Sequence, residues 1–429
     1  MPDRQEVIFL DYGNRSILLV DGQSFYASIE KSAYPGLQNK PVAVGDPERQ
    51  SGIILAACPV AKAHGVTTAS RVGEALALCR DLVVIRPRMQ RYISTSLLIT
   101  KICESFTELV EPYSIDEQFL DVTGSTGLYG SAEEIARRIQ HHVQLSTGVP
   151  TRVGIGPTKV LAKTATENFA KKCPGGIFRL DQHNIERELW PLPIHKMFMV
   201  ASRMTARFTL YGLRTIGDVA RLELPVFQKM MRRMMGKQSD IQAEYYWKIA
   251  NGIDPSPVVP SIATPLQSVS HGKALRASLY RRREDIEVVM LELAVEVGRR
   301  ARRLGYQGRV ISLGVSESDG ARAGGFHRQL TLPRPTSLTH DLIQAVLQLF
   351  HTHWQGMPVS RITISLNQLS SDDVQQLDLF EDRAKQFDLE LVTDEIKHRF
   401  GDIAIMRASS LLQAGVARER AEQIGGHYK

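Results

Sequence analysis

The stretch ILLVDGQSFYASIEK, residues 17–31, places one acidic residue, Asp21, between an apolar strand and a helix. Four consecutive aliphatic residues before Asp21 predict a buried strand, and the apolar spacing after it predicts a helix. A carboxylate at the end of a buried strand is costly unless a cation or hydrogen-bond donors compensate its charge. The stretch therefore predicts an α/β fold with a polar site at the end of its first strand.

Strands and helices continue to alternate irregularly after this stretch, and residues 181–254 are helical in character. A length of 429 residues predicts about two to four domains. The fold class we expect is therefore α/β multidomain. The expected strands are 41–45, 52–57 and 151–155, and the expected helices are 59–65, 90–108, 131–146 and 158–170.

The composition excludes several classes of protein. With 43% hydrophobic and 23% charged residues, the chain is expected to fold rather than to be disordered. Its longest apolar runs are far shorter than the roughly 20 residues that span a bilayer, and its charged N-terminus does not resemble a secretory signal. The four cysteines lack the spacing of a zinc site or a disulfide framework. We expect a cytoplasmic protein with no membrane partner.

A proline-rich segment, residues 253–268, divides the chain and is expected to be an extended linker. Residues 255–370 hold 14 Lys and Arg against 8 Asp and Glu. Helix patterns at 283–304 and 338–351 and strand patterns at 309–315 and 361–366 predict a basic α/β module with one sheet. Residues 371–429 hold 12 acidic and 8 basic residues without an obvious large core, so we expect a partly flexible tail.

A second acidic position lies in YSIDEQFLDV, residues 113–122, where Asp116 and Glu117 adjoin a strand pattern. Together with Asp21 they would supply hard oxygen ligands for Mg²⁺ or Mn²⁺, and Gly22 could add its carbonyl oxygen. Spacing alone favours another interpretation, in which Asp21 caps the following helix and the other two acids lie in a surface turn.

Three phrases, in this order along the chain, favour the metal site: LLVDGQSFYASIEK (18–31), YSIDEQFLDVTG (113–124) and VGIGPTKVLAKTATENFAKK (153–172). With the ending RASSLLQAGVARERAEQIGGHYK, they resemble the Y-family, or translesion, DNA polymerases, and most closely the Gram-positive UvrX-like (ImpB/MucB/SamB) group. The resemblance implies a right-hand polymerase with a palm, small fingers, a helical helix-hairpin-helix thumb and an α/β little finger. The implied bounds are 1–24 and 92–180 (palm), 25–91 (fingers), 181–254 (thumb), 255–370 (little finger) and 371–429 (C-terminal tail).

The resemblance also implies roles for single residues. Asp21, Asp116 and Glu117 would hold two Mg²⁺ ions, or Mn²⁺, with help from the Gly22 carbonyl. Tyr26 would be the steric gate that excludes a ribose 2′-hydroxyl.

Lysines would contact the triphosphate of the incoming dNTP, and the positions that match are Lys171 and Lys62. Pro59 departs from the family, because many relatives carry a phosphate-contacting tyrosine there. In the thumb, Met199 and Ala201 stand where glycine is usual in the hairpin.

Contacts with partners are expected from the second half of the chain. Arginines of the little finger would contact the phosphates of primer–template DNA, namely Arg276, Arg299, Arg302, Arg309, Arg328 and Arg361. In the tail, QQLDLFED (375–382) resembles the peptide by which bacterial polymerases bind the sliding clamp, the DNA polymerase III beta subunit. Its matching residues are Gln376, Leu377, Leu379 and Phe380. The alternative is a short strand that packs on the protein's own surface.

The implied activity is error-prone translesion synthesis, in which deoxynucleotides are added to a primer 3′ end by two-metal-ion nucleotidyl transfer. One alternative is a catalytically weak factor that keeps the fold and binds DNA and the clamp. Another is a different palm-type enzyme such as a nucleotide cyclase, which would need neither an arginine-rich module nor a clamp peptide.

Overall fold

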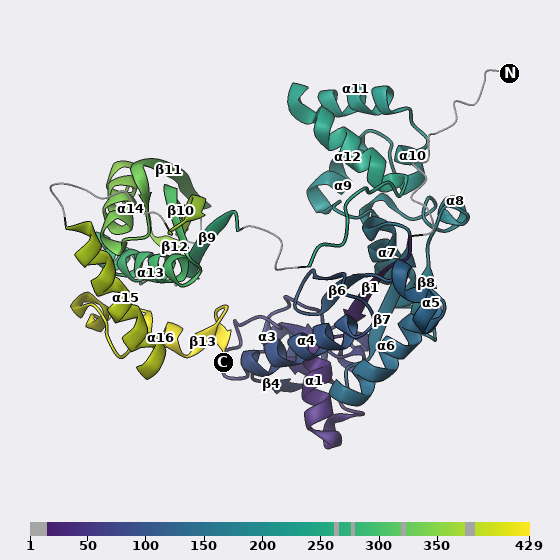
Figure 1. Cartoon of the computed structure of the whole chain (residues 1–429), viewed down its shortest axis with the longest axis horizontal. Coiled ribbons are helices and arrows are strands. Elements are labelled where there is room, and N and C mark those ends of the chain that lie inside the picture. Colours follow the sequence, from purple (N-terminus) through teal and green to yellow (C-terminus); the bar gives the residue numbers. More distant parts are fainter. Residues whose placement is uncertain (1–14, 261–265, 276–278, 319–322, 374–381) are drawn as a thin grey trace. The chain divides into compact units, whose positions relative to one another are not determined.

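The computed structural model describes residues 15–260, 266–275, 279–318, 323–373 and 382–429 (Figure 1). It divides into two compact units, Met1–Thr264 and Pro265–Lys429. Each unit contains both sheets and helices, as the sequence predicts.

The first unit is built on a five-stranded sheet of order β5-β6-β1-β7-β8. The central strand β1 (Ile17–Gly22) is buried along its whole length, which explains its uninterrupted aliphatic sequence. It pairs antiparallel with β6 (Glu117–Asp121) and with β7 (Thr151–Gly156). The edges are β5 (Val110–Pro112) and β8 (Ile177–Arg179).

The main helices that accompany this sheet lie where the sequence predicts them. They are α1 (Phe25–Ala33), α4 (Met89–Glu104), α6 (Ala132–Thr147) and α7 (Lys159–Ala165). Gly154 of β7 lets α7 pack closely, because an added Cβ would lie 2.1 Å from the Ala162 carbonyl oxygen. The sheet can therefore approach the helix that carries part of the site described below.

A smaller three-stranded sheet of order β3-β2-β4 lies in the predicted fingers. Its strands are β3 (Ala56–Ala57), β2 (Val42–Val44) and β4 (Val83–Ile85), accompanied by α2 (Pro59–Ala63) and α3 (Val72–Leu78). The strand expected over 52–57 is thus confined to its last two residues. Cys58 ends it, because its backbone takes the N-cap position of α2 and its Sγ accepts from the Ala61 amide.

The helical segment of the first unit has its own apolar core, which includes Phe208, Phe227 and Met231. Its helices are α8 (Ile185–Glu188), α9 (Ser202–Leu210), α10 (Ile216–Ala220), α11 (Leu224–Met235) and α12 (Asp240–Ala250). Just before α9, Met199 has φ +64°, a left-handed conformation that favours glycine. The hairpin therefore keeps a glycine-like backbone conformation at position 199, although the residue there is methionine.

The first part of the expected linker is packed on the first unit. Val258 is buried against Ile17, Leu19 and Phe119, and the Val259 amide donates to Glu111 Oε2 at 2.9 Å. Although its prolines lack amide protons, this segment is anchored to the sheet through the amide of Val259 and the side chain of Val258.

The second unit is a four-stranded antiparallel sheet of order β11-β10-β12-β9. Helices α13 (Arg283–Arg303) and α14 (Thr339–His353) bury their apolar residues against one face of it. Strands β10 (Tyr306–Ser318) and β12 (Val359–Ser371) extend the two predicted strands. The edge strands β9 (Ser268–Ala274) and β11 (Ala323–Thr336) were not expected from the sequence.

The described part of the tail is more ordered than expected. Helix α15 (Arg383–Phe400) contains no buried residue, but polar contacts attach it to α13, as described below. Further on, the Val416 amide donates to Glu292 Oε2 at 3.0 Å, and the Tyr280 hydroxyl donates to the Ala414 carbonyl at 3.2 Å. The segment is therefore held by buried polar pairs, together with Ala414 and Val416, which join the apolar core of the second unit.

Among the helices of the described ranges, we find none long and apolar enough to cross a membrane.

Candidate active site

The ends of β1 and β6 bring two of the predicted carboxylates together. In the antiparallel pairing of these strands, Asp21 lies directly opposite Glu117, and paired residues point to the same face of a sheet. Only 5% of Asp21 and 9% of Glu117 is exposed. Two acids from distant segments therefore converge on one buried position.

A third carboxylate, which the sequence pattern does not reveal, joins them. Glu167 lies in the π-helical turn Thr166–Ala170, which continues α7. One oxygen atom from each of Asp21, Glu117 and Glu167 lies within 4.8 Å of the others. Isolated π-turns inside helices redirect the side chains around them and often occur at functional sites.

Two lysines of the same helical segment compensate these acids. Lys163 Nζ lies 2.6 Å from Glu117 Oε1, and Lys171 Nζ lies 2.9 Å from Asp21 Oδ2. Glu167 lies between the two ammonium groups, at 3.6 Å from Lys163 and 3.0 Å from Lys171. The site is thus a chain of alternating charges, which reduces the cost of burying three carboxylates.

The surroundings shift the protonation equilibria of this chain. Burial raises the pKa of Asp21 to about 6, although the nearby Lys171 acts in the opposite direction. Burial acts to lower the pKa of Lys171, but Asp21 and Glu167 outweigh it and the pKa is raised. Burial acts to raise the pKa of Glu167, but Lys171 and Lys163 outweigh it and the pKa is lowered.

Asp116 lies beside this cluster rather than within it. Its Oδ1 accepts from the Ser114 hydroxyl at 2.6 Å, and the same hydroxyl lies 3.3 Å from Glu117 Oε2. Its backbone carbonyl accepts from the Gly22 amide at 2.8 Å. A Cβ at Gly22 would lie 3.0 Å from the Phe25 ring, so a larger residue would crowd the start of α1.

The chemistry of these donors fits divalent cations. Hard carboxylate oxygens that converge on one point are the ligands that Mg²⁺ and Mn²⁺ prefer. The buried carboxylates need positive charge, which Lys163 and Lys171 supply here. Asp21, Glu117 and Glu167 meet directly, with Asp116 adjacent through Ser114.

Two further predicted residues, Tyr26 of α1 and Lys62 of α2, lie at or contact the start of α1. The Tyr26 ring is half-buried and stacks on Tyr92, with ring centroids 4.4 Å apart and an interplanar angle of 19°. Lys62 of α2 is exposed, and its Nζ donates to the Ser24 hydroxyl at 3.0 Å. Both side chains are therefore attached to the segment that immediately follows Asp21 and Gly22.

Comparison with known proteins identifies the family. Models of the impB/mucB/samB family and of the impB/mucB/samB family C-terminal domain match residues 20–167 and 266–379. The protein "DNA polymerase IV 2" of Bacillus subtilis (strain 168) is 50% identical over 96% of this chain and 98% of its own length. The chain belongs to the impB/mucB/samB family of Y-family polymerases.

Other relatives agree with this assignment. The "Putative UV-damage repair protein UvrX" of Bacillus subtilis (strain 168) is 36% identical to this Y-family chain over 98% of the chain and 99% of its own length. The solved "Y-family DNA polymerase chimera Dbh-Dpo4(243-245)-Dbh" has a TM-score of 0.67 at 20% identity, covering 82% of this chain and 98% of its own. That structure supports the fold, and it confirms the right-hand architecture expected from the sequence.

The arginines of the little finger require a correction within this Y-family fold. Arg302 is 7% exposed, forms ion pairs with Glu390 and Asp394 of α15, and donates to the Ser337 carbonyl. Because its guanidinium is fully engaged inside the unit, we remove Arg302 from the expected DNA contacts.

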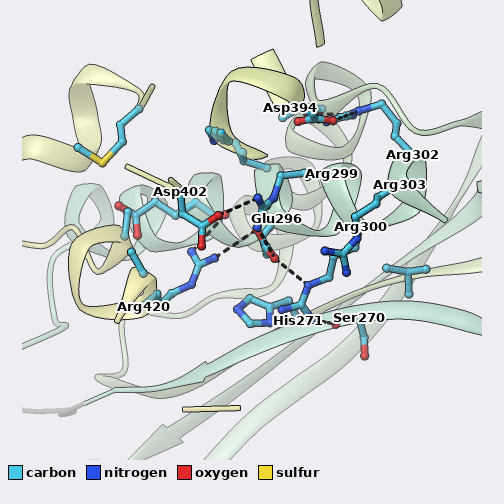
Figure 2. Close-up of a pocket in the computed structure, with 18 of the residues that line it drawn as sticks. Ser270, His271, Glu296, Arg299, Arg300, Arg302, Arg303, Asp394, Asp402 and Arg420 are labelled. Atoms are coloured by element: carbon cyan, nitrogen blue, oxygen red, sulfur yellow. Dashed lines mark hydrogen bonds and ion pairs between the residues drawn. The ribbon is translucent and has the colours of Figure 1, made fainter. Parts of the chain in front are cut away.

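Arg299, also expected to contact DNA, is likewise paired with acids inside the second unit. Its guanidinium lies between Glu296, at 3.0 Å, and Asp402, at 2.8 Å (Figure 2). A phosphate would have to displace both carboxylates. The sequence could not reveal this, because Asp402 lies about a hundred residues further along the chain.

The other expected arginines of the Y-family little finger differ in position. Arg309, Arg328 and Arg361 are exposed. Arg361 pairs with Ser316, on the sheet face opposite α13 and α14, whereas Arg328 pairs with Leu313 of the helix-covered face. Arg276 lies outside the described residues, as do the clamp-peptide residues Gln376, Leu377, Leu379 and Phe380.

Proposed function

We propose that this Y-family chain is an error-prone translesion DNA polymerase that adds deoxynucleotides to a primer 3′ end opposite a DNA template. The observation that carries the proposal is the convergence of Asp21 and Glu117 across β1 and β6, with Asp116 adjacent. Bound Mg²⁺ ions would activate the primer 3′-hydroxyl and neutralise charge on the triphosphate. Asp21, Asp116 and Glu117 would hold them, with the Gly22 carbonyl.

The lysines of the site would bind the triphosphate of the incoming dNTP. Lys171 lies 2.9 Å from Asp21, and a third of its side chain is exposed, so its ammonium group can reach a phosphate beside the carboxylates. Glu167 would keep Lys171 at the site through its 3.0 Å contact. Lys62, exposed on α2, would contact the same phosphates from the fingers.

Sugar selection is assigned to Tyr26. A ring held flat against Tyr92 cannot turn away easily, so it would present a fixed wall to the sugar and exclude a 2′-hydroxyl. The fingers would contribute little base selectivity, since their sheet is small and Ile53, which is 48% exposed just before β3, is apolar. Loose shape contact of this kind tolerates a distorted template base, which is consistent with lesion bypass at low fidelity.

Primer extension by the purified protein tests the proposal. Asp116→Ala should abolish extension, because it removes a metal ligand, and should leave binding to primer–template DNA nearly unchanged. Glu104→Ala removes an exposed acid of α4 and should extend primers like the wild type. Extension retained by Asp116→Ala would refute the metal assignment.

The same assay separates the proposal from its rivals. A wild-type protein that binds primer–template without extending it would be the catalytically weak DNA- and clamp-binding factor. A product formed from one nucleotide without DNA would indicate a cyclase.

A clamp-binding role is proposed for residues 375–382 on their sequence alone. In extension reactions with the DNA polymerase III beta subunit, the variant Leu379→Ala/Phe380→Ala should lose clamp stimulation and keep its clamp-free rate. Leu389→Ala, a change to an exposed leucine of α15, is the matched control. Equal stimulation of all three proteins would remove the clamp peptide from the proposal.

A further inference from the structure

A buried carboxylate of α1 takes no part in the metal site. Glu30 is fully buried, with 0% of its surface exposed. Arg88 donates to both of its oxygens, from Nε at 3.1 Å and from a terminal nitrogen at 2.5 Å, and the Tyr92 hydroxyl donates to Oε1 at 2.7 Å. A buried charge with three donors is costly to disturb, so this cluster holds its members in one arrangement.

The cluster is connected directly to the proposed sugar gate. Tyr26 and Glu30 are four residues apart on α1, and Arg88 and Tyr92 are four residues apart where α4 begins. Residues four apart on a helix lie on the same face. Tyr92 thus contacts both members of the first pair, Glu30 through its hydroxyl and Tyr26 through its ring.

We infer that Glu30 and Arg88 are positioning residues for sugar selection, which hold Tyr92 so that its ring fixes the tilt of Tyr26. The inference rests on the proposed gate role of Tyr26 and extends it to two residues that do not reach the nucleotide site. Tyr92 is completely buried, and its hydroxyl is anchored at the end remote from its backbone. Its ring therefore cannot swing away from Tyr26 without breaking the bond to Glu30, and the packing around it restricts rotation about its long axis.

The electrostatics of the cluster support a fixed arrangement. The hydrogen bond to Glu30 raises the pKa of Arg88. Burial and the same carboxylate raise the pKa of Tyr92, so its hydroxyl keeps its proton and remains a donor. Steric selection against a single hydroxyl depends on displacements well below the size of that group, so a slackened Tyr92 should widen the gate.

A purely structural role would give a different result. If Glu30 and Arg88 only attached α1 to α4, their loss would reduce stability and slow incorporation of both nucleotide types equally. A positioning role changes the ratio of kcat/KM for a deoxynucleotide to kcat/KM for the matching ribonucleotide.

Single-nucleotide incorporation of dCTP and CTP opposite a template dG tests the inference in the full chain. Tyr92→Phe keeps the stacked ring and removes only the hydroxyl, so it should fold, and we expect its dCTP/CTP selectivity to fall about threefold to tenfold. Glu30→Gln should lower the selectivity by a similar factor. Tyr129→Phe, which removes another hydroxyl bonded within the same unit, to the Ser105 carbonyl, should leave the selectivity unchanged.

A double-variant comparison separates this inference from the gate itself. Tyr26→Ala should lose most of the selectivity, and adding Tyr92→Phe to it should have no further effect, because the hydroxyl acts through Tyr26. Unchanged selectivity in Tyr26→Ala would refute the gate. Normal selectivity in Tyr92→Phe, with Tyr26→Ala defective, would overturn the positioning role alone.

Discussion

The buried carboxylate of Asp21 affects the stability of the fold as well as the proposed metal site. Burial raises its pKa to about 6, so the folded protein binds the Asp21 proton more tightly than the unfolded chain does. Stability therefore falls as the pH rises from about 4 to 6 and stays lower above that range. At neutral pH the ionised carboxylate opposes folding, as expected of a group whose charge serves a binding site rather than stability.

Replacement of Asp21 should therefore stabilise the metal-free protein. We expect Asp21→Asn to abolish primer extension and to raise the free energy of unfolding at pH 7 by up to about 3 kcal/mol. Thermal denaturation in the presence of a chelator measures the change, and the difference from wild type should disappear near pH 4. A less stable variant at pH 7 would show that the Lys171 contact outweighs the burial cost.

His271 of β9 shows how neighbouring elements of the second unit control one group. Its ring lies near Arg300 and Glu296 of α13 and Arg420 of the C-terminal segment (Figure 2), and the charge of Lys273 on its own strand also acts on it. Burial, with Arg420 and Arg300 next, lowers the pKa of His271 to about 4. The packing of β9 against α13 thus depends on a neutral imidazole.

Acid should therefore weaken this packing through His271. Unfolded histidine binds its proton near pH 6.5 and folded His271 near pH 4, so its contribution is complete above pH 6.5 and is lost as the pH falls toward 4. Calorimetry of the full chain should show a fall in the melting temperature over this range that is smaller in His271→Asn. His398→Asn changes an exposed histidine of α15 and should keep the wild-type profile; an identical profile for all three proteins would contradict the assignment.

Over the whole molecule, the charge distribution limits how DNA can be bound. The 53 Lys and Arg overstate the cations available to DNA, because Arg299 and Arg302 are paired with acids inside the second unit. The face opposite α13 and α14 carries small polar residues such as Thr363 and Ser365, with the exposed Arg361. We expect this face, rather than the helix-covered one, to contact phosphates.

Salt dependence distinguishes the two faces. Arg361→Ala should reduce the magnitude of the slope of log affinity against log salt by about 0.9, the value for one phosphate contact. Arg328→Ala removes another exposed arginine, whose side chain points to the other face, and should leave the slope unchanged. Fluorescence anisotropy with primer–template DNA at several salt concentrations measures both, and the reverse result would assign DNA to the opposite face.

The local sequence pattern was sufficient to predict β1, α6, α13 and α14, because their apolar residues follow the pattern of a buried strand or of an amphipathic helix. It failed for β9 and β11. Strand β9 carries few apolar residues, and β11 contains Pro333 and Pro335, which an edge strand tolerates but which resemble a loop in sequence. Asp21, Asp116 and Glu117 could be named in advance because each adjoins a strand pattern and lies in a phrase that carries the family resemblance.

Three-dimensional packing was needed for everything that depends on distant partners. Glu167 joins the site from the π-turn that continues α7, and the periodicity of the sequence does not distinguish this turn from an ordinary helix. Arg302 is withdrawn from solvent by acids of α15, and the Glu30, Arg88 and Tyr92 cluster forms where two helices meet. Periodicity records which side of an element is apolar, whereas the pairing of charges is set by which elements come into contact.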